Sequence, residues 1–487
     1  MENKTFTQYN NFINGEWTES ISKKYYSVSN PSNYSEIIGE FPLSEKEDLK
    51  RAIEHAQEAF LLWRKTQAKK RAEYIYKFSQ ELENNINYLA EILCKEQGKP
   101  IKEAISEVTR AVRESRFIAS EAERLDGVTL PSDRIGVENK SIRSPIGVVA
   151  AITPWNFPVL SPIRKILPAI MAGCTVVLKP ASETPLTSVI ITEILEKTNI
   201  PKGVVNLTIG KGSTIGNYLV GHPLVKGVSF TGSTSVGHKI NEIAAKDFTK
   251  VQLEMGGKNP AVVGKCKQLN KVADEIVNAC FGNAGQRCTA ISRVIVLDEE
   301  ADKLEELIID RVKNYTLGDG MNKNNDMGPL INQDAVDFVS QQIKIAVQDG
   351  AKIAAGGNQL NSDIYKKGFY FEPTVLTKVD PSMEIAKKEV FGPLLVIIRA
   401  HSFEEAVNIS NNTEYGLTSS IFTDSWEYAF NFTEDVESGM VHVNNGTNSE
   451  GHMPFGGIKH SGLGAFSIGS TIKDFYTDLK VIYTQYK

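Results

Sequence analysis

The chain has few cysteines and no pattern among them. Its 487 residues include five cysteines, with no Cys-x-x-Cys pair, and seven dispersed histidines without metal-ligand spacing. An odd, scattered set argues against a disulfide framework and against a zinc site, so we expect no metal. In a reducing compartment, a special cysteine is better explained as a nucleophile than as a crosslink. The five are Cys94, Cys174, Cys266, Cys280 and Cys288.

Long apolar runs and clustered positive charge are also missing. The most apolar region, residues 146–160, is interrupted by Pro154 and Pro158 and is too short to span a bilayer. Residues 1–5 are polar and no apolar segment follows them, so no signal peptide is visible. The net charge of −5 provides no basic surface for nucleic acid. We therefore expect a cytoplasmic protein without a nucleic-acid or membrane partner.

The composition of the chain is that of an ordinary globular protein. A chain of this length needs two or three domains. Ser44 and Glu47 form a potential capping box for a first helix, and apolar residues at helical spacing continue to residue 124. A cluster of Gly, Pro and Asp over residues 126–133 ends this helical block.

From residue 148 onward, short apolar strands alternate with helices. This alternation predicts βαβ units around parallel sheets, which bind ligands at the carboxyl ends of their strands. The first set has predicted strands at 148–152, 175–178, 204–207 and 227–230, with helices at 163–171 and 185–197. The second set lies between 260 and 440 and includes strands at 261–263, 293–296 and 441–443.

Four segments could carry chemistry, and the first two suit negatively charged groups. In Thr153-Pro154-Trp155-Asn156, which follows a predicted strand, the Asn156 amide could donate to a developing oxyanion. Residues 230–237 follow another strand and open a helix, whose N-terminus and glycines favour a phosphate. Taken alone, each segment is also explained as a plain turn, and residues 230–237 match neither the Rossmann nor the Walker pattern.

The other two segments supply an acid and a thiol. Glu254 precedes a Gly-Gly turn and could be a general base if it is partly buried, although a solvated turn acid also explains it. Cys288 follows Gly285 and Arg287, and nearby positive charge could lower the pKa of its thiol. A buried structural cysteine is an equally good explanation of Cys288 alone.

Together, the order and spacing of these four segments resemble the aldehyde dehydrogenase superfamily. The resemblance covers essentially the whole chain, from Phe-Ile-Asn-Gly-Glu-Trp at 12–17 to Pro-Phe-Gly-Gly-Ile-Lys at 454–459, and includes Glu-Val-Phe-Gly-Pro at 389–393. It implies an α/β fold with a Rossmann-type doubly wound cofactor domain, an α/β catalytic domain and a small β extension for oligomerisation. The expected boundaries are 1–122 and 146–257 for the cofactor domain, 258–460 for the catalytic domain, and 123–145 and 461–487 for the extension.

The resemblance also implies a mechanism. Cys288 would attack the aldehyde carbonyl, and the oxyanion of the thiohemiacetal would be held by the cysteine N–H and the Asn156 amide. Hydride transfer to the nicotinamide would leave a thioester. Glu254 would then activate water to hydrolyse it.

Nine positions match residues that contact the cofactor in the family. Lys179 matches the adenosine-ribose contact, and Glu389 matches the carboxylate that holds the nicotinamide ribose. NAD-preferring members often carry a glutamate three residues after the lysine, where this chain has Ser182. A serine leaves room for a 2′-phosphate, so we predict that NADP is used at least as well as NAD, unless Glu183 swings in and keeps NAD preferred. The nine are Thr153, Trp155, Lys179, Ser182, Gly232, Ser233, Met255, Glu389 and Phe391.

Three arginines suggest an aldehyde with an anionic tail, since arginine suits carboxylate, sulfonate or phosphate. Arg164 matches the substrate-binding arginine of succinate-semialdehyde dehydrogenases, although a surface or subunit-contact arginine is an alternative. Arg287 resembles its counterpart in ketoglutarate-semialdehyde enzymes, and Arg293 matches a widespread arginine that can be structural. Succinate semialdehyde is the leading substrate, with 2-oxoglutarate semialdehyde, sulfolactaldehyde, lactaldehyde and broad-range aldehydes behind it.

Two other uses of the fold stay open, a CoA-acylating enzyme and a non-catalytic structural relative. Keeping Cys288, Glu254 and Asn156 together argues against a scaffold, and Glu254 argues against CoA acylation, where a thiol replaces water. Exposed strands near 128–143 and 470–487 would pair with another subunit. A homodimer or homotetramer is expected.

Overall fold

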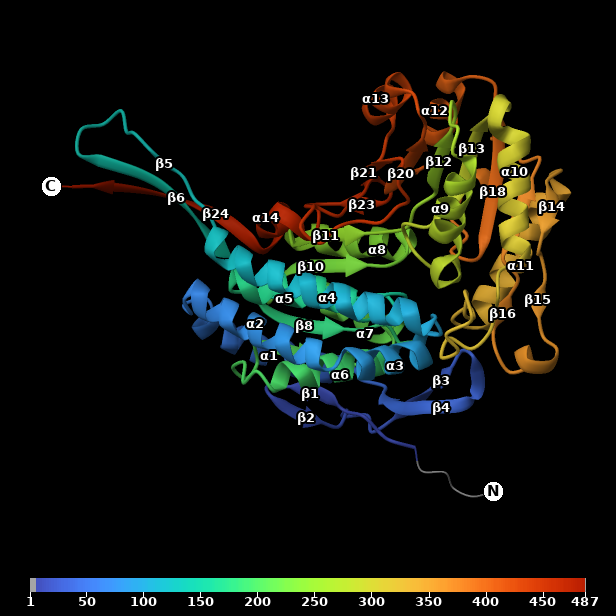
Figure 1. Ribbon diagram of the computed structural model, residues 1–487. Helices are drawn as coiled ribbons and strands as arrows, with labels where there is room; N and C mark the ends of the chain where they lie inside the picture. Colours follow the sequence, from blue (N-terminus) through green and yellow to red (C-terminus); the bar gives the residue numbers. More distant parts are fainter. Residues whose placement is uncertain (1–5, 487) are drawn as a thin grey trace.

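The computed structural model describes residues 6–486 and contains two large sheets and a projecting arm of strands (Figure 1). The polar residues 1–5, for which the sequence predicts no signal peptide, lie outside the described part. No helix within residues 6–486 is long and apolar enough to cross a membrane.

The first sheet has a parallel centre and antiparallel edges. Each predicted strand of this region is present, within two residues of its expected ends. The strand order is β2 (Glu16–Thr18), β1 (Asn11–Ile13), β9 (Val205–Leu207), β8 (Thr175–Lys179), β7 (Val148–Ile152), β10 (Val225–Thr231), β11 (Lys250–Glu254) and β23 (Gly462–Leu463).

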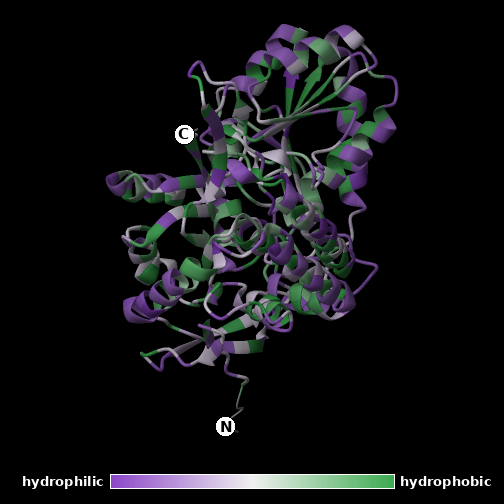
Figure 2. Cartoon of the chain, turned by 90° about the vertical axis from the view of Figure 1, so that its left-hand side faces the viewer, coloured by the Kyte–Doolittle hydropathy of each residue, from purple (hydrophilic) through white to green (hydrophobic). Residues whose placement is uncertain are grey.

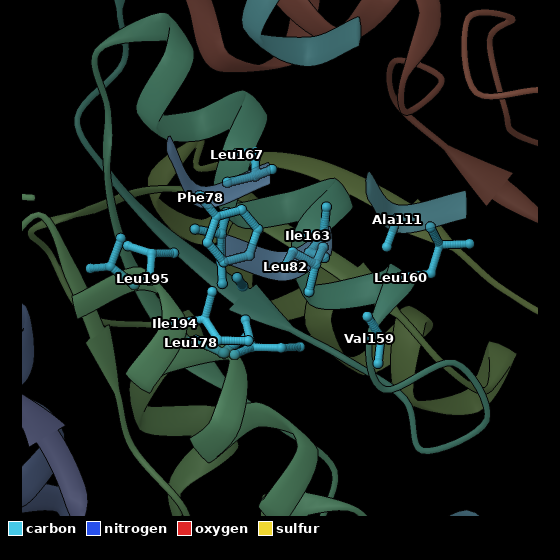
Figure 3. Close-up of a cluster of buried hydrophobic side chains, with 14 of the residues drawn as sticks. Phe78, Leu82, Ala111, Val159, Leu160, Ile163, Leu167, Leu178, Ile194 and Leu195 are labelled. Atoms are coloured by element: carbon cyan, nitrogen blue, oxygen red, sulfur yellow. The ribbon is translucent and has the colours of Figure 1, made fainter. Parts of the chain in front are cut away.

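Alternate residues of the central strands face two different cores, because successive side chains in a strand point to opposite faces. Val149 and Ala151 of β7 belong to the larger core, whereas Val148 and Ala150 belong to the smaller one. Figure 3 shows part of the larger core, where side chains from α2, α4, α5 and α6 gather over Leu178 of β8. Its helices are α2 (Ala68–Asn84), α3 (Ile86–Gln97), α4 (Ile101–Glu121), α5 (Leu160–Ala172) and α6 (Pro185–Glu196).

The opposite face is covered by α1 (Lys46–Trp63), α7 (Gly212–Val220) and α8 (Thr234–Ala244). The start of α1 differs from the predicted capping box. The Asp48 carboxylate accepts the backbone N–H of Glu45 (2.9 Å), and the Ser44 hydroxyl instead accepts the Asn11 amide (2.8 Å). The Ser44–Glu47 prediction is therefore wrong by one residue, since Ser44 is used to tie α1 to β1.

The second sheet is parallel except at one edge, and its central strands are buried on both faces. In Figure 2 its strands are largely green, while the helices around it carry purple turns. The strand order is β14 (Lys352–Ala355), β17 (Thr374–Thr377), β18 (Leu394–Ala400), β13 (Ile291–Leu297), β12 (Asn259–Val263), β20 (Thr418–Phe422) and β21 (Met440–Val443). The helices are α9 (Leu269–Phe281), α10 (Asp298–Lys313), α11 (Gln333–Gln348), α12 (Phe403–Asn411) and α13 (Trp426–Asp435).

The arm is a separate antiparallel sheet that projects to the left in Figure 1. It consists of β24 (Thr477–Gln485), β6 (Val137–Pro145) and β5 (Thr129–Leu130). The chain before β24 does not join it, because β23 pairs with β11 and α14 (Ile472–Tyr476) packs on α5. Strand pairing in the extension therefore starts at Thr477 rather than at 461. A hairpin of β3 (Tyr25–Asn30) and β4 (Asn33–Pro42) lies apart from both large sheets.

Candidate active site

A cavity of about 630 Å³ opens where the carboxyl ends of β7, β10 and β11 face the loops of the second sheet. Parallel sheets place ligands at this edge. The cavity brings together most of the residues singled out in the sequence. Those lining it are Trp155, Asn156, Arg164, Gly232, Ser233, Glu254, Met255, Arg287, Cys288, Glu389 and Phe391.

The side chain of Asn156 is buried and bridges the two sheets. Its amide nitrogen donates to the backbone carbonyl of Gln286 (2.9 Å), two residues before Cys288. One N–H of the amide is used in this bond. The other is available for an oxygen in the cavity that Asn156 lines.

The loop that carries Cys288 has an unusual backbone. Asn283, Ala284 and Gly285 all have positive φ (54°, 55° and 70°), and a Cβ at Gly285 would collide with the Gly392 carbonyl. The buried Gln286 side chain holds this loop, because it accepts the Ile331 N–H (2.9 Å) and donates to backbone carbonyls.

Asn259 holds the other side of the same loop. Its amide donates to the carbonyls of Cys288 (2.7 Å) and Ala290 (2.8 Å). The sequence reasoning missed both Gln286 and Asn259, since neither is a chemical group of the reaction. The only signal was the Asn-Ala-Gly run before Gln286, because Asn and Gly accept left-handed backbone most readily.

Cys288 opens onto the cavity as a half-buried thiol. Burial raises its pKa to about 12, and the carboxylates of Glu254 and Glu389 add to this effect, against the opposing charges of Arg164 and Arg287. The sequence-based expectation of a lowered pKa is therefore wrong, because desolvation and two acids outweigh the neighbouring arginine. The resting group is a thiol.

Glu254 ends β11 and is buried. One carboxylate oxygen accepts the Thr231 hydroxyl (2.8 Å), which comes from the paired position at the end of β10. The other oxygen, Oε1, has no hydrogen-bond partner among the described residues. A buried carboxylate oxygen without a partner is costly, so this atom fits a water or a reacting group.

Two glycines, Gly256 and Gly257, lie against the carboxylate of Glu389. Its carboxylate accepts the Gly257 N–H (3.0 Å), and a Cβ at Gly256 would collide with it. Burial raises the pKa of Glu389 to about 7. Phe391 next to it has φ of 56° and packs edge-on against Trp155, with ring centroids 5.5 Å apart.

Lys179, Ser182 and Thr153 do not line this cavity but lie at the adjacent strand ends. The Lys179 ammonium is buried, which lowers its pKa to about 8, and it donates to the Pro180 carbonyl (2.8 Å). The Ser182 hydroxyl lies 3.5 Å from the Gly210 carbonyl, and the Thr153 N–H donates to the Lys179 carbonyl (3.2 Å).

These groups fit a dinucleotide cofactor. A buried cation lies at the end of β8, and Ser233 caps the N-terminus of α8 by accepting the Val236 N–H. A buried carboxylate, Glu389, lines the cavity from the segment before β18 of the second sheet. A cation and a helix N-terminus suit phosphates and ribose, and a carboxylate suits a ribose hydroxyl pair.

The three arginines predicted to bind substrate have different environments. Arg164 is buried at the cavity wall and donates to both carboxylate oxygens of Glu114 (2.7 Å each). Arg287 lines the cavity and donates to the carbonyls of Asn278 and Ala279 at the end of α9.

Arg293 lies outside the cavity lining and is buried within the second sheet. Its guanidinium donates to three backbone carbonyls, those of Lys258, Ile409 and Ser410 (2.9–3.1 Å). These bonds connect β12, β13 and α12. The structure therefore gives Arg293 a structural environment instead of the expected substrate contact.

Comparison with known proteins agrees with this site. Residues 17–482 match the model described as "Aldehyde dehydrogenase family". The chain belongs to this family. The α/β fold class and the NAD(P)-dependent aldehyde dehydrogenase activity predicted from the sequence are thereby confirmed.

Individual members are similar over nearly their whole length. The alpha-ketoglutaric semialdehyde dehydrogenase of Bacillus subtilis is 38% identical, with 98% of each chain covered. The NADP(+) succinate-semialdehyde dehydrogenase of Escherichia coli is 36% identical, with 95% of each covered. The structure of betaine aldehyde dehydrogenase from Staphylococcus aureus in complex with NAD+ superposes with a TM-score of 0.96 at 34% identity, covering 99% of this chain and 96% of that one.

The raised pKa of Cys288 predicts how its alkylation depends on pH. Below the pKa, the thiolate fraction rises about tenfold per pH unit, so the rate with iodoacetamide should rise about tenfold for each pH unit between pH 7 and pH 10, without a plateau. Mass spectrometry of the peptide that contains Cys288 measures the rate. Glu254→Gln should accelerate alkylation at pH 8, because one acid that raises the pKa is removed. A plateau below pH 9 would contradict the raised pKa.

Proposed function

We propose that this aldehyde dehydrogenase oxidises a short aldehyde with one negative charge at its far end, with succinate semialdehyde as the leading candidate. The observation that carries this proposal is a charge cluster at the cavity wall. Arg110 and Arg164 share the single carboxylate of Glu114, to which both Nε atoms donate (2.7 Å each). The cluster therefore keeps one surplus positive charge.

The surplus charge is available to the cavity. Both arginines line it, and Arg110 also donates to the Ser449 hydroxyl (2.9 Å), which lines it too. The Arg164 guanidinium lies over the Phe455 ring, 4.8 Å from its centroid, so the ring covers one face of the guanidinium. A single carboxylate or sulfonate matches one surplus charge, whereas a phosphate dianion does not. The relatives described above, named for ketoglutaric and succinate semialdehydes, support a monoanionic substrate.

The other basic side chains near the substrate are less available. Lys99 is paired with Glu107 and Lys102 with Asp326. Arg287 is held on the end of α9, and we propose that it contacts the tail only secondarily. Succinate semialdehyde fits a tail bound by Arg110 and Arg164. The semialdehyde of 2-oxoglutarate and sulfolactaldehyde are alternatives with the same charge.

In the proposed mechanism, the protein supplies a nucleophile, an oxyanion site and a base. The Cys288 thiol gives its proton to water in the cavity as its sulfur attacks the carbonyl carbon, and the Asn156 amide and the Cys288 N–H donate to the developing oxyanion. Lys179, Ser233 and Glu389 would hold a bound NAD(P), which would supply the hydride acceptor for this adduct. Glu254 then accepts a proton from water at Oε1, while Thr231 holds Oε2, and the water hydrolyses the thioester.

A panel of aldehydes tests the substrate. We expect kcat/KM for succinate semialdehyde to exceed that for butanal, its uncharged counterpart, by about 10- to 100-fold, as for a charge-assisted hydrogen bond. Acid should form stoichiometrically without CoA. Arg110→Met should remove most of the preference, because the cluster becomes neutral. It should raise KM for succinate semialdehyde and leave KM for butanal unchanged.

Lys102→Met is the matched control for Arg110→Met. Lys102 also lines the cavity, but its charge is balanced by Asp326 (3.1 Å), so the preference should persist. Equal efficiency with butanal and succinate semialdehyde in the unmodified enzyme would exclude the anionic-tail proposal. Dependence on CoA would favour an acylating enzyme.

We further propose that NADP is used at least as well as NAD. Ser182 carries no charge that would repel a 2′-phosphate, and the Lys179 ammonium lies on the same segment. Ser182→Glu should therefore lower kcat/KM for NADP at least about tenfold and leave NAD nearly unchanged. Ser182→Gln, of the same size without the charge, should affect both cofactors equally. A strong NAD preference in the unmodified enzyme would contradict this proposal.

We also propose that the arm assembles subunits into a dimer or tetramer. Leu479, Val481 and Tyr483 alternate along β24 and are 58–65% exposed, which forms an apolar strand face without a cover in one chain. Leu479→Glu with Val481→Glu should give single chains by light scattering, whereas Lys480→Glu on the other face should not. A cytoplasmic location stays a prediction from the sequence.

A further inference from the structure

A buried ion pair at the cavity wall supports the loop of Asn156, and no step of the mechanism uses it. Lys99 lies in the turn before α4, and Glu107 lies within α4. Nζ and Oε2 are 2.6 Å apart, and each side chain is only 1% exposed. A buried pair of charges costs desolvation free energy, so it needs further hydrogen bonds to be tolerated.

Those further hydrogen bonds all go to the loop between β7 and α5. The Lys99 ammonium donates to the backbone carbonyl of Asn156 (2.9 Å) and lies 4.4 Å from the centroid of the Phe157 ring. The second carboxylate oxygen of Glu107 accepts the N–H groups of Val159 and Leu160 (3.0 Å each), where α5 begins. The pair therefore holds both ends of the segment that carries Asn156.

Lys99 itself is fixed by the second sheet's loops. A Cβ at Gly320 would collide with the Lys99 carbonyl, and the Ile101 N–H donates to the Gly320 carbonyl (2.8 Å). A Cβ at Gly98 would lie 2.8 Å from Pro329. Because the backbones approach this closely, the main chain at Lys99 is fixed. Its side chain therefore leaves the backbone at a fixed point. The Asn283 amide also reaches the Asn156 carbonyl, at 3.3 Å.

We propose that Lys99 and Glu107 are positioning residues that hold the Asn156 amide at the oxyanion site. Asn156 is then fixed at two points, its backbone carbonyl by Lys99 and its side chain by the Gln286 carbonyl. A displacement of about 1 Å in such a donor costs about 100-fold in rate. Lys99 and Glu107 act on the reaction only through Asn156, so this inference rests on the oxyanion role proposed for that residue.

A double-mutant cycle tests the inference. Lys99→Met should lower kcat about 10- to 100-fold and change KM less than about twofold, because formation of the thiohemiacetal is slowed and binding is not. In an Asn156→Ala background the same substitution should lower kcat less than about twofold, since the group through which Lys99 acts is gone. Alkylation of Cys288 by iodoacetamide, which needs no oxyanion site, should keep its rate.

Two control variants separate positioning from general damage. Lys99→Arg keeps a cationic donor and should restore at least part of kcat. Glu96→Gln alters another buried carboxylate that caps a helix, through Leu186 and Thr187 of α6, away from the cavity. Its effect on kcat should be small and equal in both backgrounds, although it should lower the melting temperature.

Each result decides one question. If Asn156→Ala alone leaves kcat unchanged, the proposed oxyanion role fails before Lys99 is considered. If Asn156→Ala is impaired and Lys99→Met lowers kcat equally in both backgrounds, or not at all, the positioning role is overturned. Where Lys99→Met does not fold, the same cycle is run with Glu107→Gln, which keeps the lysine and an oxygen acceptor for α5.

Discussion

The active site depends on one hydrogen bond that crosses between the two large sheets, from the Asn156 amide to the Gln286 carbonyl. On one side Asn156 follows β7, and on the other Gln286 belongs to the loop that carries Cys288. Cys288, the proposed nucleophile, and Asn156, the proposed oxyanion donor, therefore come from loops of different sheets, and neither sheet alone forms the site. The buried Gln286 side chain and Asn259 fix the thiol side of this junction.

Burial sets the electrostatics of this junction. Burial raises the pKa of Cys288 to about 12 and that of Glu389 to about 7, because a charged form is costly to hold away from water. Attack on a carbonyl relieves part of this cost, because the proton leaves and the new charge lies on an oxygen with donors around it. A protonated resting thiol and a supported oxyanion are thus expected from the same cavity.

The strands that the sequence predicted in both sheets are present to within a few residues, because alternating apolar runs leave a local pattern. Its motifs also brought Asn156, Glu254 and Cys288 to attention, and the structure places all three at one cavity. The sequence did not predict what holds those groups. In the sequence, Glu107 and Glu114 are ordinary charges on a helix and Lys99 is a charge just before it. Their burial follows from the packing of α4 against α5. The thiol pKa was predicted in the wrong direction, since Arg287 is adjacent in sequence, whereas the burial that raises the pKa and the opposing acids Glu254 and Glu389 depend on the fold.

The shared carboxylate of Glu114 has a consequence for how such enzymes diversify. It sets the charge at the far end of the substrate cavity, yet it contacts neither the thiol nor the residues that fit the cofactor. A single base change from a glutamate to a glutamine codon would alter the charge that the cavity selects and leave the reacting groups in place. The charge of the substrate tail and the chemistry at the thiol are therefore governed by separate parts of the chain, the first of them α4.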